Sequence, residues 1–140
     1  MNKQLRDELI KRSQEEPFGR LLGFEVVTVA PGSSKVRMRV RPDFLNMFKA
    51  LHGGAVFSLI DEAFQLACNT HGVLSVALNV SITYVASPGS DTILEARADE
   101  IYMTNRTASY ICNVREIDSG KLIATAQALA YRTGKQINIS

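Results

Sequence analysis

The sequence predicts an α+β fold in which an antiparallel sheet wraps around one long central helix. A near-continuous apolar segment over residues 53–70 allows roughly four helical turns or more and needs cover on most of its sides. Strand-like segments precede and follow it, and the later ones are joined by short connections typical of an antiparallel meander. A chain of 140 residues can bury a sizeable core without a metal or a disulfide, so we expect a single domain over residues 1–140.

Before the central helix, the sequence predicts a short helix and a β-hairpin. Residues 1–17 alternate apolar and charged side chains at helical spacing, which predicts an amphipathic N-terminal helix that stops at Pro17. The next segments are predicted as a strand, a turn, a strictly alternating strand and an irregular loop, over residues 24–30, 31–33, 35–41 and 43–51.

After the central helix, the sequence predicts four strands. Residues 73–86 alternate cleanly, which predicts a long half-buried strand. The apolar face of this strand is expected to carry Leu74, Val76, Leu78, Val80, Ile82 and Tyr84. Further strands are predicted over residues 92–103, 107–117 and 121–132.

Composition excludes several classes of protein. The net charge is only +2 and no block of like charges occurs, which argues against a dedicated nucleic-acid binder. The N-terminus is too polar for a signal peptide and no apolar run is long enough for a membrane span, so we expect a cytoplasmic protein without a membrane partner. Cys68 and Cys112 are expected to be buried free thiols, and no metal site is expected because the spacings of His and Cys fit none.

The start of the central helix, His52-Gly53-Gly54, is the strongest chemical signal. Two glycines let a ligand approach free backbone N–H groups, where the helix dipole favours an oxygen that becomes negative. Polar side chains then share one sector of about 100° on the helical wheel. They are Ser58, Asp61, Glu62, Gln65 and Asn69. On the wheel alone this stripe most simply faces water, whereas a helix wrapped by a sheet favours a pocket or a subunit interface.

A carboxylate in such a pocket could deprotonate a water molecule or attack a carbonyl directly. Gly53 and Asp61 are eight residues apart, which is about 12 Å along a helix, so one helix cannot place both on one carbonyl. Two copies of the chain with antiparallel helices would bring them together, and we therefore predict a homodimer.

Several motifs carry a resemblance to a known family. Asn46 lies six residues before His52-Gly53-Gly54, and Asp61 lies nine residues after the histidine. The same match continues through segments 57–61, 67–69, 81–84 and 88–91 and covers about residues 20–132. In these features the chain resembles the hotdog-fold acyl-CoA thioesterases of the PaaI type.

The resemblance implies hydrolysis of acyl-CoA thioesters to free acid and CoA, by a homodimer or a dimer of dimers. Asp61 would be the general base or the nucleophile, and the Gly53 N–H of the partner subunit would polarise the carbonyl with help from Asn46. The positions expected to contact substrate are His52, Gly54, Ser58, Gln65 and Ala77. No cofactor is implied, because CoA is part of the substrate.

Two positions depart from the family pattern. Lys49 occupies the place, three residues before the histidine, where members often carry glycine. Ala77 occupies a place where some relatives carry a serine that helps to hold the water. The water would then be held by Ser58, Gln65 or the backbone, or Asp61 attacks directly.

Other residues and other functions have competing interpretations. The pocket walls are expected to include Phe57, Phe64, Leu78 and Tyr84, and the acyl group stays open. Glu62 is expected to be structural, and His71 to cap the end of the helix. A row of basic residues could attract CoA phosphates, although an exposed sheet face is the favoured interpretation; the row is Lys35, Arg37, Arg39 and Arg41.

The alternative functions are a non-catalytic acyl-CoA sensor and a hotdog dehydratase or hydratase.

Overall fold

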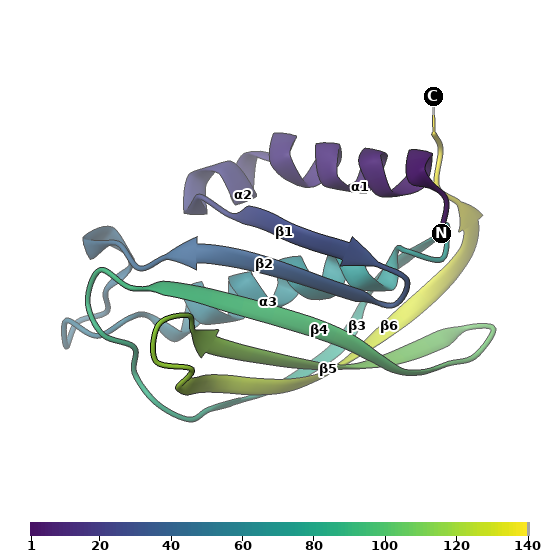
Figure 1. Cartoon of the computed structure of the whole chain (residues 1–140). Helices are drawn as coiled ribbons and strands as arrows, with labels where there is room; N and C mark the ends of the chain where they lie inside the picture. The colour runs from purple at the N-terminus through teal and green to yellow at the C-terminus, as the bar shows by residue number, and fades with distance from the viewer. Residues whose placement is uncertain (140) are drawn as a thin grey trace.

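One antiparallel sheet curves around a long helix, α3 (Gly53–Cys68), in the computed structural model, which describes residues 1–139 (Figure 1). The sheet has six strands in the order β1-β2-β4-β5-β6-β3. The strands are β1 (Glu25–Ala30), β2 (Ser33–Arg39), β3 (Val73–Tyr84), β4 (Ile93–Met103), β5 (Thr107–Glu116) and β6 (Leu122–Gln136). The remaining elements are α1 (Lys3–Glu15), α2 (Pro17–Leu22) and the 3-10 turn η1 (Pro42–Phe44). The predicted α+β fold is confirmed.

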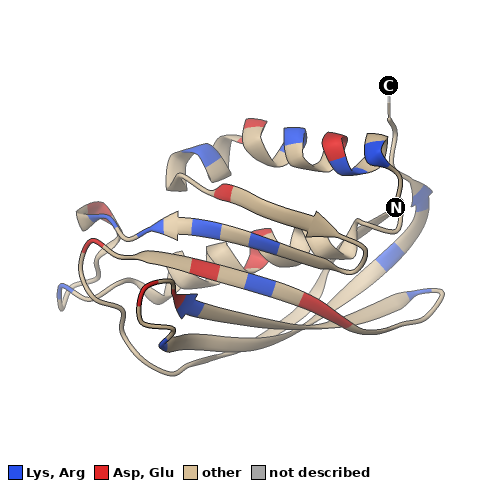
Figure 2. Cartoon of the chain, viewed as in Figure 1, with Lys and Arg blue, Asp and Glu red and all other residues tan. Residues whose placement is uncertain are grey.

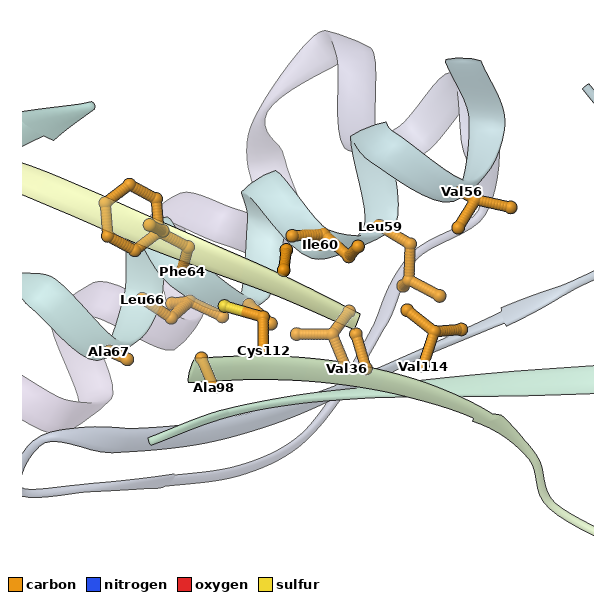
Figure 3. Packing of buried hydrophobic residues seen from close by; sticks show 14 of the residues in the cluster. Val36, Val56, Leu59, Ile60, Phe64, Leu66, Ala67, Ala98, Cys112 and Val114 are labelled. Atoms are coloured by element: carbon orange, nitrogen blue, oxygen red, sulfur yellow. The ribbon is translucent and has the colours of Figure 1, made fainter. Parts of the chain in front are cut away.

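The core lies between α3 and the inner face of the sheet (Figure 3). Leu59, Ile60 and Phe64 of the helix are at most 1% exposed, and the ring of Phe64 packs edge-on against Tyr110 of β5 at 5.5 Å. Small side chains on the inner face let the sheet approach the helix closely. They include Ala96, Ala98, Ala124, Ala126, Ala128 and Ala130. The prediction that Phe64 lines a pocket is therefore wrong, because this ring belongs to the core.

The N-terminal helix ends just before Pro17, as predicted, but a second short helix that was not predicted follows it. Asn2 caps α1 by accepting a hydrogen bond from the Leu5 N–H at 2.8 Å, and α1 ends at Glu15. Pro17 then opens the short helix α2, since proline fits the first turn of a helix, where no N–H partner is needed. Gly23 ends α2 in the left-handed conformation with φ of 74°. Together α1 and α2 lie along β1 and one side of α3 (Figure 1).

Strand β3 forms one edge of the sheet, and its predicted apolar face is divided by a bulge. The register shifts between Ala77 and Asn79, so that Ala77 pairs with Ala130 while Val80 pairs with Ala128. Both alanines of β6 are buried, so Ala77 and Val80 both face α3, although in a regular strand residues three positions apart face opposite sides. The prediction of one continuous face is wrong. Leu78, the extra residue, is 58% exposed.

The basic row on β2 pairs mainly with carboxylates on its neighbours (Figure 2). Arg37 binds Glu95 of β4 at 2.9 Å, and Arg39 binds Asp91 at 3.1 Å. Such exposed pairs contribute little stability. Their partners favour the reading as a solvated sheet face over a phosphate site.

Within residues 1–139 no helix is both long and apolar enough to span a bilayer. Cys68 and Cys112 are buried and free, as predicted, and burial raises the pKa of each thiol to about 12. His71 does not cap α3: its Nε2 lies 2.7 Å from a carboxylate oxygen of Glu100, at the far end of β4. Asn69 and Thr70 satisfy the end of the helix instead.

Candidate active site

The first turn of α3 presents one free backbone donor. The His52 ring accepts a hydrogen bond from the Gly54 N–H through Nδ1 at 2.9 Å, and the N–H groups of Ala55 and Val56 reach the His52 carbonyl at 3.0 and 3.4 Å. Within the part of the chain that the structure describes, the Gly53 N–H donates to no acceptor. A free N–H at the positive end of a helix suits an oxygen on which negative charge develops.

His52 thus acts as the cap of the helix. Because Nδ1 accepts the Gly54 hydrogen bond, the neutral ring carries its proton on Nε2. This bond occupies the Gly54 N–H, which leaves Gly53 as the donor at the helix start. The role of His52 in contacting substrate stays a prediction.

Tyr84 of β3 packs directly on Gly53, a contact that the sequence did not reveal. Its hydroxyl donates to the Gly53 carbonyl at 3.0 Å. A Cβ on Gly53 would lie only 3.1–3.2 Å from atoms of the Tyr84 side chain, so the close approach favours glycine. These two residues also line a groove of about 320 Å³ with Val56 and Pro88.

The loop before α3 is organised by Asn46. Its Oδ1 accepts from the N–H groups of Phe48 at 2.9 Å and Ala50 at 3.2 Å, which leaves the side-chain NH2 as the group that can bind a ligand. Lys49 has a φ of 62°, so it adopts the left-handed conformation that glycine adopts without strain. Lys49 thus differs from the family pattern in its side chain, while its backbone has the conformation that suits glycine.

Replacing Lys49 by glycine is expected to stabilise the protein modestly. The substitution removes left-handed strain of about 1–2 kcal/mol per residue but adds chain entropy to the unfolded state. We expect an increase of about 0.5–1 kcal/mol in the free energy of unfolding, measured by urea denaturation. Lys135→Gly, at an exposed position near the end of β6, is the control. A lower unfolding midpoint for Lys49→Gly would contradict the strain at this position.

The predicted polar stripe of α3 divides into two sets. Glu62 and Asn69 are buried, whereas Asp61 and Gln65 are exposed, and Ser58 is partly exposed. Nearby protein atoms and the negative charge of Glu16 raise the pKa of Asp61. A carboxylate with a raised pKa is a better base, which suits proton abstraction from water.

Glu62 is structural, as the sequence predicted. The Ser13 hydroxyl of α1 donates to it at 2.6 Å, and the side chain is 5% exposed. Burial and a hydrogen bond with the Glu16 carboxyl raise the pKa of Glu62 to about 8. The protonated carboxyl therefore joins α1, the start of α2 and α3.

This raised pKa makes stability depend on pH. Because the folded protein holds the Glu62 proton more tightly than the unfolded chain does, the contribution is complete below the ordinary glutamate pKa and is lost as the pH rises through about 8. We expect the thermal midpoint of the wild type to fall between pH 6 and about 9, and that of Glu62→Gln to fall less. Glu15→Gln is the matched control, since Glu15 is exposed. Parallel pH profiles of wild type and Glu62→Gln would contradict this account.

The remaining predicted positions surround the same helix. His52, Gly54 and Ser58 line a groove of about 300 Å³ together with Phe44 of η1. Gln65 lines a second groove, of about 280 Å³, near the other end of α3. Ala77 faces α3 from β3 and offers no side-chain hydrogen bond. Gly53 and Asp61 lie on one helix, about 12 Å apart along its axis, so a single chain does not bring them to one carbonyl.

Comparison with known proteins identifies the family. Residues 48–123 match the family model described as the thioesterase superfamily. The chain belongs to the thioesterase superfamily. This thioesterase is 40% identical over 115 residues to a putative esterase of Archaeoglobus fulgidus. The match covers 82% of this chain and 74% of the relative. It is 27% identical over 124 residues to the acyl-coenzyme A thioesterase PaaI of Escherichia coli, over 89% of the chain and 88% of PaaI.

Solved structures agree with these sequence matches. The Escherichia coli PaaI structure superposes on the thioesterase with a TM-score of 0.87 and 25% identity, and covers 96% of this chain and 99% of PaaI. A Streptococcus mutans protein bound to acetyl-CoA superposes with a TM-score of 0.77 and 25% identity, over 81% of this chain and 91% of that one. The predicted hotdog fold and the predicted resemblance to PaaI-type thioesterases are confirmed, and the thioesterase is a thioester hydrolase.

Sequence reasoning missed three hydrogen bonds that hold residues of the site in place. Tyr84, Ser13 and Glu16 each bond to a residue near the site, but they come from three other elements. Tyr84 was expected on a pocket wall, but its hydrogen bond to Gly53 was not. Ser13 and Glu16 have no motif that points to α3.

Proposed function

We propose that this thioesterase hydrolyses acyl-CoA thioesters to a free acid and CoA, with Asp61 as general base or nucleophile. The observation that carries the proposal is the free Gly53 N–H at the start of a helix that also bears an exposed carboxylate with a raised pKa. The names of two relatives support the substrate class, since one is an acyl-CoA thioesterase and another is bound to acetyl-CoA.

In the general-base route, the Asp61 carboxylate accepts a proton from water while the water oxygen attacks the thioester carbon. The carbonyl oxygen becomes negative and accepts a hydrogen bond from the Gly53 N–H. The C–S bond then breaks, and the CoA thiolate takes the proton from Asp61. In the nucleophilic route, Asp61 attacks the thioester carbon first, the C–S bond breaks and CoA leaves as the thiolate, and a water molecule then hydrolyses the resulting anhydride to the free acid and the Asp61 carboxylate.

A second copy of the chain completes the site in this proposal. The axial separation of Gly53 and Asp61 requires that the Gly53 N–H come from the partner. Strand β3 supports this arrangement because it is an edge strand with unpaired backbone groups on one side, and its exposed apolar residues include Leu74, Val76 and Leu78. Pairing of two β3 edges would place the two α3 helices antiparallel. A dimer of dimers and a cytoplasmic location remain predictions.

The other site residues receive roles by position. The free NH2 of Asn46 binds the substrate near the carbonyl, while His52 and Gly54 shape the start of the helix. Ser58, Gln65 and Ala77 bound the space around Asp61. No cofactor takes part, because CoA belongs to the substrate. His52 is a poor choice for the base of a dehydratase, since Nδ1 is committed to the Gly54 N–H.

Thiol release on purified protein tests the proposed function. Aroyl-, phenylacetyl- and straight-chain acyl-CoAs are each incubated with the enzyme, and free CoA thiol is measured beside calorimetric binding. We expect catalytic release of thiol with at least one series. Binding of acyl-CoA without release of thiol would overturn hydrolysis and favour a sensor.

A further inference from the structure

The side-chain amide of Gln65 is held in one orientation by two carboxyl groups. Its Nε2 donates to Glu16 at 3.1 Å and to Glu62 at 3.3 Å. The Glu16 carboxylate only accepts hydrogen bonds, and the protonated Glu62 carboxyl can still accept through its carbonyl oxygen, so the nitrogen faces the Glu16 side and the oxygen turns away from it. The orientation therefore follows from the chemistry of the partners.

Both partners are themselves fixed by other elements. Glu16 folds over the first turn of α2, where a Cβ on Gly19 would lie only 2.8 Å from a Glu16 carboxylate oxygen. Glu62 is buried and bonded to the Ser13 hydroxyl. Arg12 also lines this groove, but it binds Glu8 and the carbonyl of Asn138.

Gln65 lies directly beside Asp61. The two residues are four positions apart on α3, which places their Cβ atoms about 5–6 Å from each other. Both are exposed on the same side of the helix, and the charge of Glu16 reaches Asp61. The amide oxygen of Gln65 is thus an acceptor near the carboxylate, with no partner among residues 1–139.

The other candidates for holding water are less suitable. The Ser58 hydroxyl donates to the Gly54 carbonyl of its own helix at 2.8 Å, which ties it to the start of α3. Ala77 has no polar side-chain atom. Gln65 is the residue whose acceptor is both free and held in place.

We propose that Gln65 is a catalytic residue whose amide oxygen holds the hydrolytic water beside Asp61, and that Glu16 and Glu62 are positioning residues that orient this amide. The inference rests on the proposed hydrolysis with Asp61 as general base. The water molecule donates one hydrogen bond to Asp61 and one to Gln65. The hydrogen directed at Asp61 is then transferred to this carboxylate. A lone pair of the water oxygen attacks the thioester carbon, the C–S bond breaks, and the Asp61 proton leaves on the CoA thiol. The second hydrogen stays on the new carboxyl group and is lost to solvent.

Steady-state kinetics of four variants test this role. Gln65→Met keeps the length of the side chain but removes the amide, and we expect kcat to fall about 10- to 100-fold with KM changed less than about twofold. Glu16→Gln lets the amide turn and should lower kcat by a smaller factor. The matched controls Glu15→Gln and Asp118→Asn, both at exposed positions away from the site, should retain the wild-type kcat. A thermal melt of each variant confirms that it is folded.

Isotope labelling of the wild type tests the general-base route on which this inference rests. A single turnover in H2(18)O should place 18-O in the product acid, because the attacking oxygen comes from water. If Gln65→Met releases thiol with the wild-type kcat, the inference is overturned while hydrolysis stands. The same holds if the label first appears in Asp61 of the wild type. Absence of thiol release by the wild type would overturn the proposed function itself.

Discussion

Replacement of Asp61 by asparagine is expected to lower kcat by about 100- to 10,000-fold, because the amide cannot accept a proton from water. Asparagine has the same shape, and Asp61 forms no hydrogen bond or ion pair among the described residues, so the fold should be unaffected. Thiol release from the best acyl-CoA substrate measures the effect, and a thermal melt checks the fold.

The pH profile of the wild type gives the same prediction a second form. The base must be ionised, so kcat rises with pH through its pKa. Since burial and Glu16 raise the pKa of Asp61, we expect the rising limb above the range of an ordinary aspartate.

Asp118→Asn is the matched control for the Asp61 variant. Asp118 is exposed in the turn between β5 and β6, and its replacement should leave kcat unchanged. Wild-type turnover by Asp61→Asn would show that this carboxylate is not the base or the nucleophile.

Replacement of Gly53 by proline is expected to lower kcat by about 100- to 1,000-fold, because proline lacks the N–H that binds the developing oxyanion. Proline suits the first position of a helix, and His52 already has the extended conformation required before proline, with φ of −66° and ψ of 132°. The substitution therefore removes one donor from a backbone that can accept it.

Gly53→Ala separates loss of the donor from crowding. Alanine keeps the N–H but places a Cβ against Tyr84, as proline also does. We expect alanine to be impaired much less than proline. If both variants lose the same activity, crowding at Tyr84 is the cause and the N–H is not needed.

Mixing the two inactive variants tests whether partners share a site. A mixed dimer of Asp61→Asn and Gly53→Pro has one site with both defects and one site with neither. Random pairing should restore about a quarter of the wild-type activity. Mixed dimers, verified by mass spectrometry, that regain no activity would exclude the shared site.

The sequence predicted the central helix and the succession of strands along the chain well, because hydrophobic periodicity and short connections are local signals. The apolar run of α3 and the alternation of β2 suffice for their assignment. The bulge at Leu78 could not be predicted, since alternation continues through it without interruption. Pro17 does follow the first helix, but its second role, as the first residue of α2, was not predicted because the sequence pattern is the same for both.

The candidate site was predictable where one segment carries it. His52 caps α3, and Gly53 and Asp61 both lie on this helix. Their spacing alone showed that Gly53 and Asp61 cannot act on one carbonyl within one chain. The contacts of Gln65 were not predictable, because Glu16 lies 49 residues earlier in the sequence and meets it only through the packing of α1 on α3. Tyr84 was expected on a pocket wall, yet its hydrogen bond to Gly53 depends on how β3 curves past the start of the helix.

The bulge in β3 changes which residues of the strand face α3. Before Leu78 the odd-numbered positions face α3, and after it the even-numbered positions do, which lets Ala77 and Tyr84 both point inward. Without the extra residue, a strand in which Tyr84 reaches Gly53 would turn position 77 outward. One extra residue in the strand thus decides whether the side chain at position 77 faces α3, and therefore whether a substitution there can affect the proposed reaction. Variation in this part of the family is therefore best compared by register with β6, since a gapless alignment across the bulge would match inward positions with outward ones.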